Sequence, residues 1–310
     1  MTEGRHYLVT GGAGFIGSAI ADRLTIAGHR ITIIDDLSTG SISNVPTDAT
    51  FVEADLTSDA ALAVIPSRPY DAILHLAGQA SGEKSFDDPL LDLDANARST
   101  VMLAKWAIEQ RIPALIHASS MGVYGNPLEL PVAESVDCDP CSWYGASKLA
   151  AERALKVARQ SGLRTVSLRM FSVYGPGQNL SDLRQGMASI FLSMLRDQQS
   201  VDVHGPLDRV RDLVYIDDCV DAWVKALAGD ACGAFNVGTG IGTSVGTLID
   251  ILIEQLGLPF DTSVTESGPT LGDQRAMIAD PSLIARELGW TAQTDLRTGL
   301  ANMVEWASHV

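Results

Sequence analysis

Short apolar segments alternate with helical patterns through the first half of the chain. Six segments have the length and the Val, Ile and Leu content of buried strands: residues 6–10, 30–35, 50–55, 71–77, 114–120 and 164–170. Helical spacing is found at residues 15–27, 89–110 and 144–161. Repetition of strand, helix and strand predicts a parallel sheet with helices on both faces. We therefore expect an α/β fold with a doubly wound, Rossmann-type sheet.

The pattern changes after residue 171. A loop-like stretch rich in Gly, Pro and Asn, "VYGPGQNLSD" (173–182), comes first. Shorter helices are expected at residues 185–197, 217–228, 244–256 and 295–306, and strands at 213–216 and 234–238. These elements predict a smaller C-terminal part, residues 172–310, that is partly interleaved with the first, residues 1–171. We expect residues 211–238 to return to the first part.

Charge narrows the classes of partner. The 310 residues include 22 Lys and Arg against 38 Asp and Glu, a formal charge of -16. This charge repels nucleic acid and anionic membranes, so we expect neither as a partner, and a phosphate must be bound by local donors. The chain start lacks a secretory leader pattern, and no stretch reaches the roughly 18 apolar residues that span a bilayer. We expect a cytoplasmic protein.

The four cysteines do not predict a disulfide scaffold, because they are too few for a chain of this size. Cys138 and Cys141 form a C-x-x-C pair, which is compatible with redox chemistry or half of a zinc site. There is no second pair, Pro140 lies inside the motif, and no helix starts directly after Cys141. We interpret the two as thiols in a loop and expect no metal.

A glycine-rich turn follows the first predicted strand and opens a helix, in "LVTGGAGFIGSAIADRL" (8–24). Gly12, Gly14 and Gly17 fit G-x-G-x-x-G, which permits a tight turn and close approach of backbone N–H groups to a pyrophosphate. The spacing alone also fits a plain turn. The strand before it, the helix after it and an acidic residue about twenty positions later favour a dinucleotide site.

That acidic residue is Asp35, at the end of the second strand. A carboxylate there accepts hydrogen bonds from the adenosine ribose hydroxyls and repels a 2′-phosphate, which favours NAD over NADP. Asp55, at the end of the third strand, is placed to reach the adenine. Both residues are also compatible with a helix cap or turn.

A tyrosine and a lysine lie four residues apart in "SWYGASKLAAER" (142–153). On a helix, Tyr144 and Lys148 share one face. An unperturbed tyrosine titrates near pH 10, and two nearby cations, Lys148 and an oxidised nicotinamide, would lower its pKa enough for it to act as a base. Ser119 and Ser120 end the fifth strand, at the edge where open α/β sheets bind ligands. Each residue alone also fits a helix surface or a strand end.

The chain resembles an extended short-chain dehydrogenase/reductase, and most closely a nucleotide-sugar 4-epimerase of the UDP-glucose type. The motifs that carry the resemblance span nearly the whole length: "TGGAGFIGS", "DDLSTG", "HLAGQA", "SSMGVYG", "YGASK", "VYGPGQN", "RVRDLVYIDD", "FNVGTG" and "ADPSLIARELGW". The resemblance implies residues 1–171 as an NAD-binding Rossmann domain, residues 172–310 as a nucleotide-sugar-binding part, and a homodimer formed by the helices at 89–110 and 144–161.

Site residues follow from the same resemblance. It implies a catalytic set of Ser120, Tyr144 and Lys148. Around NAD it implies Gly11, Gly14, Phe15, Ile16, Gly17, Asp35, Asp36, Ser38, Gly40, Asp55, Leu56, His75, Leu76, Ala77, Gly78 and Asn96 besides Tyr144 and Lys148. Around the nucleotide sugar it implies Ser120, Ser172, Arg211 on the diphosphate, Asp273 on the ribose, Arg275 and Met277. The implied reaction oxidises C4 of the hexose and returns the hydride to its other face.

Three positions depart from the family pattern. Ser172 replaces a usual Asn, and Thr270 stands where a second phosphate-binding Arg is expected, for which Arg275 is a candidate substitute. Met277 occupies the position that gates the C2 substituent. Arg209 joins Arg211 as a candidate for the diphosphate, and the alternative for both is a surface pair bridging Asp208 and Asp212.

Other functions remain open. A 4,6-dehydratase needs an acid and a base directly after the catalytic hydroxyl residue, where this chain has Met121 and Gly122. An epimerase for N-acetylhexosamines or uronic acids is a further alternative, and Lys84, Arg184 or Arg196 are candidates to meet a 6-carboxylate. A silent NAD-binding scaffold is the last, although it would be expected to lose Tyr144 or Lys148.

Overall fold

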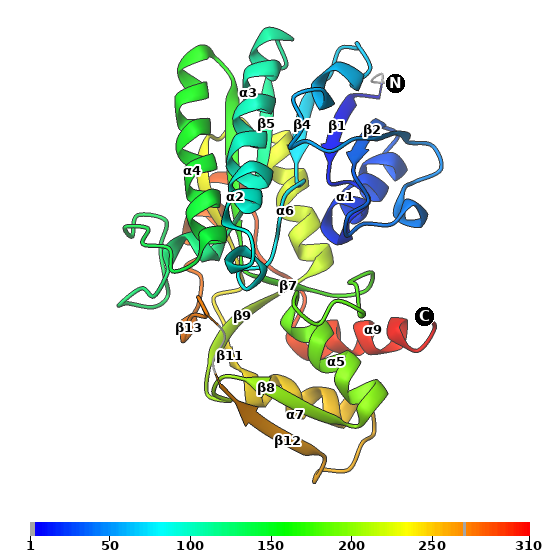
Figure 1. Ribbon diagram of the computed structural model, residues 1–310, viewed down its shortest axis with the longest axis vertical. Helices are drawn as coiled ribbons and strands as arrows, with labels where there is room; N and C mark the ends of the chain where they lie inside the picture. Colours follow the sequence, from blue (N-terminus) through cyan, green and yellow to red (C-terminus); the bar gives the residue numbers. More distant parts are fainter. Residues whose placement is uncertain (1–3, 269–270) are drawn as a thin grey trace.

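A seven-stranded parallel sheet forms the larger part of the molecule (Figure 1). The computed structural model describes residues 4–268 and 271–310. The strand order is β10-β6-β5-β4-β1-β2-β3. The strands are β1 His6–Thr10, β2 Arg30–Asp35, β3 Thr50–Glu53, β4 Ala72–His75, β5 Ala114–Ser120, β6 Arg164–Met170 and β10 Gly233–Val237. Because the chain runs outward from β1 in both directions, a crevice opens between the carboxyl ends of β1 and β4. The predicted Rossmann-type fold is confirmed.

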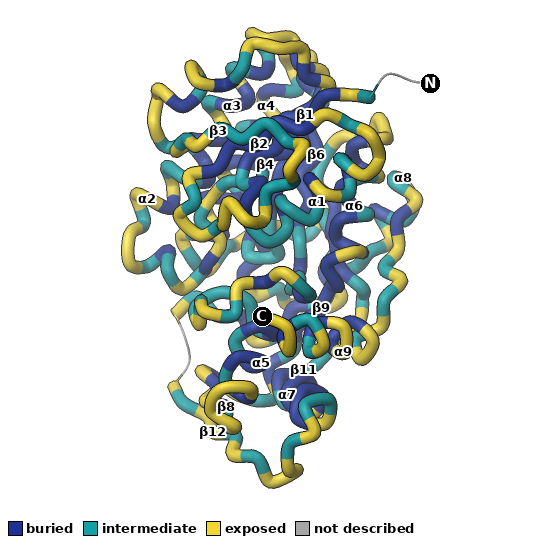
Figure 2. Tube along the Cα trace, turned by 90° about the vertical axis from the view of Figure 1, so that its right-hand side faces the viewer, coloured by how far each residue is buried: buried dark blue, intermediate teal, exposed yellow. Residues whose placement is uncertain are grey.

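Helices cover both faces of this sheet. α1 Phe15–Ile26, α6 Ile216–Ala228 and α8 Ser282–Leu288 lie on one face. The other face carries α2 Pro89–Leu93, α3 Ser99–Glu109 and α4 Trp143–Ala158. Strands buried between two helical layers must be apolar on both sides, which is why they read as continuous apolar runs in the sequence. Figure 2 shows the buried residues concentrated along these strands and along α6.

The smaller part lies beyond the carboxyl edge of the sheet (Figure 1). It contains β7 Ser172–Tyr174, β9 Val210–Tyr215, β11 Gly242–Ser244 and β13 Ala276–Met277 in one sheet, and β8 Ser200–His204 with β12 Ser263–Ser267 in another. α5 Met187–Gln198, α7 Val245–Gln255 and α9 Leu296–Ala307 pack there. One core cluster runs from Val9 in β1 through Trp223 in α6 to Leu248 in α7, so the two parts share buried apolar surface.

Residues 211–238 divide between the two parts. β10 pairs with β6 in the large sheet and α6 packs on it, whereas β9 pairs only within the small sheet. The assignment of residues 1–171 and 172–310 to separate domains stays a prediction.

Two expected elements differ in detail. The helix predicted at 89–110 is interrupted by a π-helical segment, Asp94–Arg98, between α2 and α3. The third strand ends at Glu53, because the Asp55 carboxylate accepts hydrogen bonds from the Thr57 N–H and hydroxyl and turns the chain.

Candidate active site

The glycine-rich turn between β1 and α1 is built by close backbone contacts. Gly11 has φ +70°, and a Cβ on Gly17 would lie 2.1 Å from the Gly11 carbonyl oxygen. A Cβ on Gly11 itself would lie 2.5 Å from the Ala77 nitrogen at the end of β4. The absence of side chains therefore brings the start of α1 against the sheet edge and leaves its first N–H groups open to an anion.

A cavity of about 380 Å³ extends from this turn along the carboxyl edge of the sheet. Its lining includes Gly11, Gly14, Phe15, Ile16, Gly17, Asp35, Asp36, Ser38, Asp55, Leu56, Leu76, Ala77, Gly78, Tyr144 and Lys148, all of which the sequence predicted around NAD. Asp35 is 7% exposed and accepts hydrogen bonds from the Ala13 and Leu37 backbone N–H groups, each at 2.9 Å. Burial raises the pKa of this carboxyl.

Asp35 is thus both the predicted ribose carboxylate and a turn residue. Each carboxylate oxygen has a further lone pair for a ligand hydroxyl. The cavity therefore fits a dinucleotide: a glycine turn, a helix N-terminus and an acid at the end of β2 line one continuous space.

Three predicted cofactor residues lie outside the lining. Gly40 packs on Ala13, and a Cβ there would lie 2.8 Å from the Ala13 carbonyl carbon. His75 is buried inside the sheet, where its ring nitrogens bond the Thr10 and Thr100 hydroxyls. Asn96 lies in the π-helical segment behind the cavity. These three lie behind the residues that line the cavity.

Asn96 nevertheless faces the catalytic helix. Its buried Oδ1 has no partner among the described residues and would lie 2.3 Å from a Cβ on Gly78. The Lys148 Nζ lies 3.3 Å from the same hypothetical Cβ on Gly78. Gly78 thus leaves space in which a carbonyl oxygen and a cation approach each other.

Tyr144 and Lys148 sit where two cavities meet. Both lie in the first turns of α4, which begins after Ser142, whose hydroxyl accepts from the Gly145 N–H. The Lys148 Nζ lies 5.7 Å from the Tyr144 ring centroid. Burial lowers the pKa of Lys148 to about 8 and raises that of Tyr144 to about 12, while a hydrogen bond with Ser120 acts to lower the latter. Lys148 is therefore mostly protonated at pH 7.

The second cavity, of about 600 Å³, lies between the sheet edge and the smaller part. Its lining includes Ser120, Tyr144, Ser172, Arg211 and Asp273 from the predicted set. Tyr144 also lines the first cavity, so its side chain faces both cavities. Met121 and Gly122, which follow Ser120, line the same space and carry no titratable group.

Two buried arginines form the far wall of this cavity. Arg209 and Arg211 are 6% and 4% exposed. Both bond the Asp273 carboxylate, Arg211 through Nη2 at 2.5 Å. Burial and the neighbouring Arg209 lower the pKa of Arg211 to about 9.

The surface-pair alternative for these arginines is wrong. Asp212 is buried and accepts from the backbone of Thr239, Gly240 and Ala279, and Asp208 pairs with Arg275. Two guanidinium groups sharing one carboxylate leave a net positive charge at this wall of the cavity, which suits a diphosphate.

The structure does not place two other predicted substrate residues in the cavity. The Arg275 side chain, just before β13, is 75% exposed and reaches outward to Asp208. Met277 is 0% exposed in the core. Neither is among the residues that line the described cavities. Thr270 lies outside the described residues.

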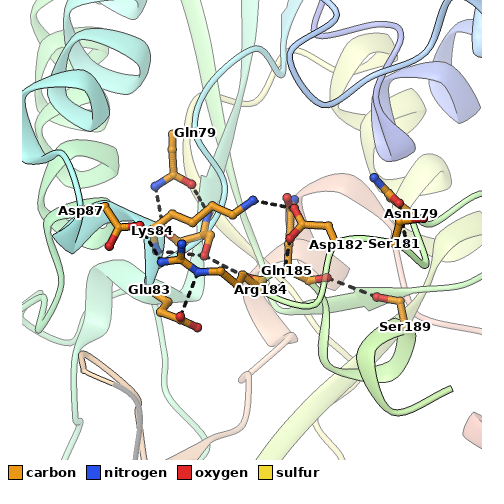
Figure 3. Close-up of polar contacts among 11 residues, drawn as sticks. Gln79, Glu83, Lys84, Asp87, Asn179, Ser181, Asp182, Arg184, Gln185 and Ser189 are labelled. Carbon is orange, nitrogen blue, oxygen red and sulfur yellow. Dashed lines mark hydrogen bonds and ion pairs between the residues drawn. The ribbon is translucent and has the colours of Figure 1, made fainter. Parts of the chain in front are cut away.

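Sequence reasoning missed the roof of the site. Two loops, residues 79–88 after β4 and 178–186 after β7, meet over the junction of the cavities (Figure 3). Lys84 Nζ bonds Asp182 at 2.6 Å, and Arg184 bonds Glu83 at 2.9 Å and Asp87 at 2.7 Å. We call these ion pairs the clasp. No local pattern in the sequence predicts that charges about 100 positions apart would form ion pairs.

The three cations that the sequence suggested for binding a uronic acid already have partners within the protein. Lys84 and Arg184 belong to the clasp, and Arg196 bonds Asp197 and the Ala307 carbonyl. In the part of the chain described, these three positive charges are already neutralised or turned away from the cavity.

Comparison with known proteins agrees with the geometry. Residues 7–238 match the model of the NAD dependent epimerase/dehydratase family. The chain belongs to this family. A UDP-glucose 4-epimerase of Mycolicibacterium smegmatis is 36% identical over 308 residues, covering 96% of this chain and 97% of that protein.

Solved structures agree as well. The UDP-glucose 4-epimerase of Thermotoga maritima with UDP-glucose has a TM-score of 0.93 at 33% identity, covering 98% of this chain and 99% of that one. The Thermus thermophilus UDP-glucose 4-epimerase complex with NAD has a TM-score of 0.89 at 32% identity, covering 98% and 100%. The chain is therefore similar over its length to NAD-dependent epimerases. Among the described helices, none is long and apolar enough to cross a bilayer.

Proposed function

We propose that the protein is an NAD-dependent 4-epimerase of a UDP-hexose, with UDP-glucose and UDP-galactose as its substrate pair. The observation that carries the proposal is the position of Tyr144, which lines both a dinucleotide cavity and a second cavity with an arginine-rich wall. The family match and the similarity to UDP-glucose 4-epimerases over 96% of the chain support the choice of chemistry.

Tyr144 serves as the acid and base at the sugar 4-hydroxyl. Its buried phenol has a pKa of about 12, so cations must stabilise the phenolate before it can take a proton near neutral pH. Lys148 supplies one positive charge from the next turn of α4. Ser120 shares a hydrogen bond with the phenol and is placed to guide the same proton.

Bound in the first cavity, NAD would supply a reversible acceptor for the C4 hydride. The residues that would hold it are those of the first cavity, with the glycine turn at the pyrophosphate and Asp35 at the adenosine ribose. Arg209 and Arg211 would hold the substrate diphosphate, and Ser172 the sugar side of it. Firm binding at the diphosphate lets the hexose turn over while the nucleotide stays in place.

The absence of an acid–base pair after Ser120 separates this proposal from a dehydratase. Elimination of water requires a proton donor and acceptor near C5 and C6, and Met121 and Gly122 provide neither. The paired states of Lys84 and Arg184 likewise favour a neutral hexose over a uronic acid.

A panel of UDP-sugars tests the proposal. Purified protein with NAD should convert UDP-glucose and UDP-galactose into each other, with products separated by chromatography. A 4-keto-6-deoxy product would instead indicate a dehydratase. Turnover of only the N-acetyl or uronic sugars would assign the enzyme to that substrate class. No turnover of any UDP-sugar would favour the catalytically silent NAD-binding scaffold.

Tyr144→Phe removes the titrating oxygen and keeps the ring. We expect turnover to fall by at least ~10²-fold, since positioned acid–base catalysis contributes about that much. Binding of UDP-glucose, measured by calorimetry, should stay within about twofold. Retained turnover would remove Tyr144 from its role.

A homodimer is part of the proposal. The outer faces of α3 and α4 expose Val101 (49%) and Val157 (64%), and α2 beside them exposes Leu90 (74%). Apolar side chains on adjacent helices suit burial against a second copy. The cytoplasmic location stays a prediction from the sequence.

A further inference from the structure

A buried carboxylate outside the predicted catalytic set lies against the catalytic helix. Asp92, in α2, is 1% exposed. Its oxygens accept hydrogen bonds from the Ser147 hydroxyl at 2.6 Å, the Gln79 amide at 2.7 Å and the Asn96 amide at 3.3 Å. It forms no ion pair within the described residues. Burying an unpaired carboxylate is costly, so such a group is retained where its charge or its hydrogen bonds serve a function.

The hydrogen bonds of Asp92 join three parts of the site. Ser147 lies between Tyr144 and Lys148 in the first turns of α4. Gln79 begins the loop that forms the roof, and its amide also bonds the Ser81 carbonyl at 2.7 Å (Figure 3). Asn96 lies in the π-helical segment. Asp92 therefore connects the catalytic turn, the roof loop and the helix behind the cofactor cavity.

Asp92 is also the negative charge that acts on the catalytic pair. It opposes the effect of burial on Lys148, acting to raise the pKa of that ammonium, and it acts to raise the pKa of Tyr144. The other titratable groups facing Lys148 are His75 of β4 and His117 of β5. Burial and Lys148 lower the pKa of both imidazoles, so both are neutral.

Two other sets of charges that pack near α4 are paired among themselves. Glu152 of α4 and Arg169 of β6 form a buried ion pair at 2.7 Å. The clasp holds Lys84, within the 79–88 loop that packs on α4, against Asp182. Among the described residues, Asp92 is a buried carboxylate without an ion-pair partner whose charge acts on Lys148.

We propose that Asp92 is a positioning residue for the proposed epimerase reaction: its carboxylate holds the turn that carries Tyr144 and Lys148 and keeps Lys148 protonated. The two tasks are separable, because the hydrogen bond to Ser147 sets geometry and the charge sets protonation. This inference rests on the proposed function for its kinetic part only. Its electrostatic part concerns Lys148 in the protein itself.

Asp92→Asn tests the charge. The variant keeps the size of the side chain and removes its negative charge, so the pKa values of Lys148 and Tyr144 should both fall. In kcat against pH, the rising limb and the falling limb should both move to lower pH, by roughly 0.5 to 1 unit. KM should stay within about twofold. Asp94→Asn, two residues along, is the matched control, because the Asp94 side chain makes no hydrogen bond within the described chain; it should leave both limbs in place.

A titration by NMR tests the same charge without turnover. Protein labelled with ¹³C at the lysine Cε carbons shows the Lys148 signal, assigned by its loss in Lys148→Met. The Lys148 pKa in Asp92→Asn should lie roughly 0.5 to 1 unit below that of the wild type. An unchanged Lys148 pKa would overturn the inference whether or not the protein turns over UDP-glucose. A wild-type protein that turns over none of the UDP-sugars would instead contradict the proposed function.

Ser147→Ala tests the geometry. It also keeps the positioning role testable if Asp92→Asn does not fold. It removes the hydroxyl that Asp92 holds and keeps the charge. We expect kcat to fall at least ~5-fold, since small displacements of a catalytic group are costly, with both pH limbs unchanged. Wild-type kcat in Ser147→Ala would overturn the positioning role.

Discussion

At the scale of residues, each of the two buried arginines both pairs with a carboxylate and faces a cavity. Arg209 and Arg211 share the Asp273 carboxylate and line the second cavity. Burial lowers the pKa values of both guanidinium groups, so their charge is held at a cost that an incoming anion relieves. We therefore expect a diphosphate that supplies the missing counter-charge to be bound at this wall.

Arg211→Lys should separate charge from geometry at the diphosphate. A lysine keeps the charge and loses the planar fork, so a charge-assisted hydrogen bond worth about 1.5 to 3 kcal/mol is lost. We expect KM for UDP-glucose to rise about ten- to hundredfold with little change in kcat. Arg275→Lys is the control, since that side chain is exposed and paired with Asp208. An equal effect in both variants would contradict the assignment of Arg211 to the diphosphate.

At the scale of elements, the roof is made by two loops that the sheet topology brings together. One loop follows β4 and the other follows β7, and both leave the carboxyl edge of their strands. The ion pairs of the clasp are partly exposed, so each contributes only ~0.2 to 1 kcal/mol and is weakened by salt. The Ser81 hydroxyl adds a hydrogen bond to the Arg184 carbonyl at 2.9 Å. The clasp therefore joins the two loops through weak contacts that salt reduces.

Opening the clasp should speed ligand release. In Asp182→Asn combined with Arg184→Gln, all three ion pairs of the clasp are lost, and we expect the dissociation rate of UDP-glucose to rise about two- to fivefold. Stopped-flow measurement at low and high salt checks this, and high salt should reduce the difference from the wild type. The matched control is Arg297→Gln, which breaks the exposed Arg297–Glu254 pair between α9 and α7. Equal release rates in the wild type and the double variant at low salt would show that the roof does not limit exchange.

At the scale of the whole molecule, the exposed apolar residues of α3 and α4 form the surface for the proposed dimer. These helices cover the face of the sheet opposite α1 and α6 (Figure 1). The π-helical segment and the catalytic turn lie on the same layer, so a partner there would also support the active site from behind.

Introducing charge on this surface should yield a monomer. The wild type should scatter light as a particle of twice the chain mass of 32.9 kDa, and Val101→Glu combined with Val157→Glu should halve that mass. Two charges forced into an apolar interface must be desolvated, which outweighs the burial that they replace. Ile26→Glu, at an 85% exposed position on α1, should leave the mass unchanged. A wild-type particle of 32.9 kDa would rule out the dimer.

The local parts of the site followed from the sequence because they depend on short spacings. The turn from Gly11 to Gly17 and the Tyr144–Lys148 spacing are set within one turn or one helix face, and Asp35 ends a recognisable strand. Alternation of apolar and helical patterns likewise determined the Rossmann-type sheet, since strands covered on both faces must be apolar.

Only the tertiary structure decided which distant residues meet. Asp92 reaches Ser147, and Lys84 reaches Asp182, across separations that no local pattern encodes. The same folding buried Met277 in the core, where β13 pairs with β9, and left Arg275 exposed in an ion pair with Asp208, against expectation. Spacing fixes neighbours along one element, whereas packing between elements selects the contacts that close a cavity.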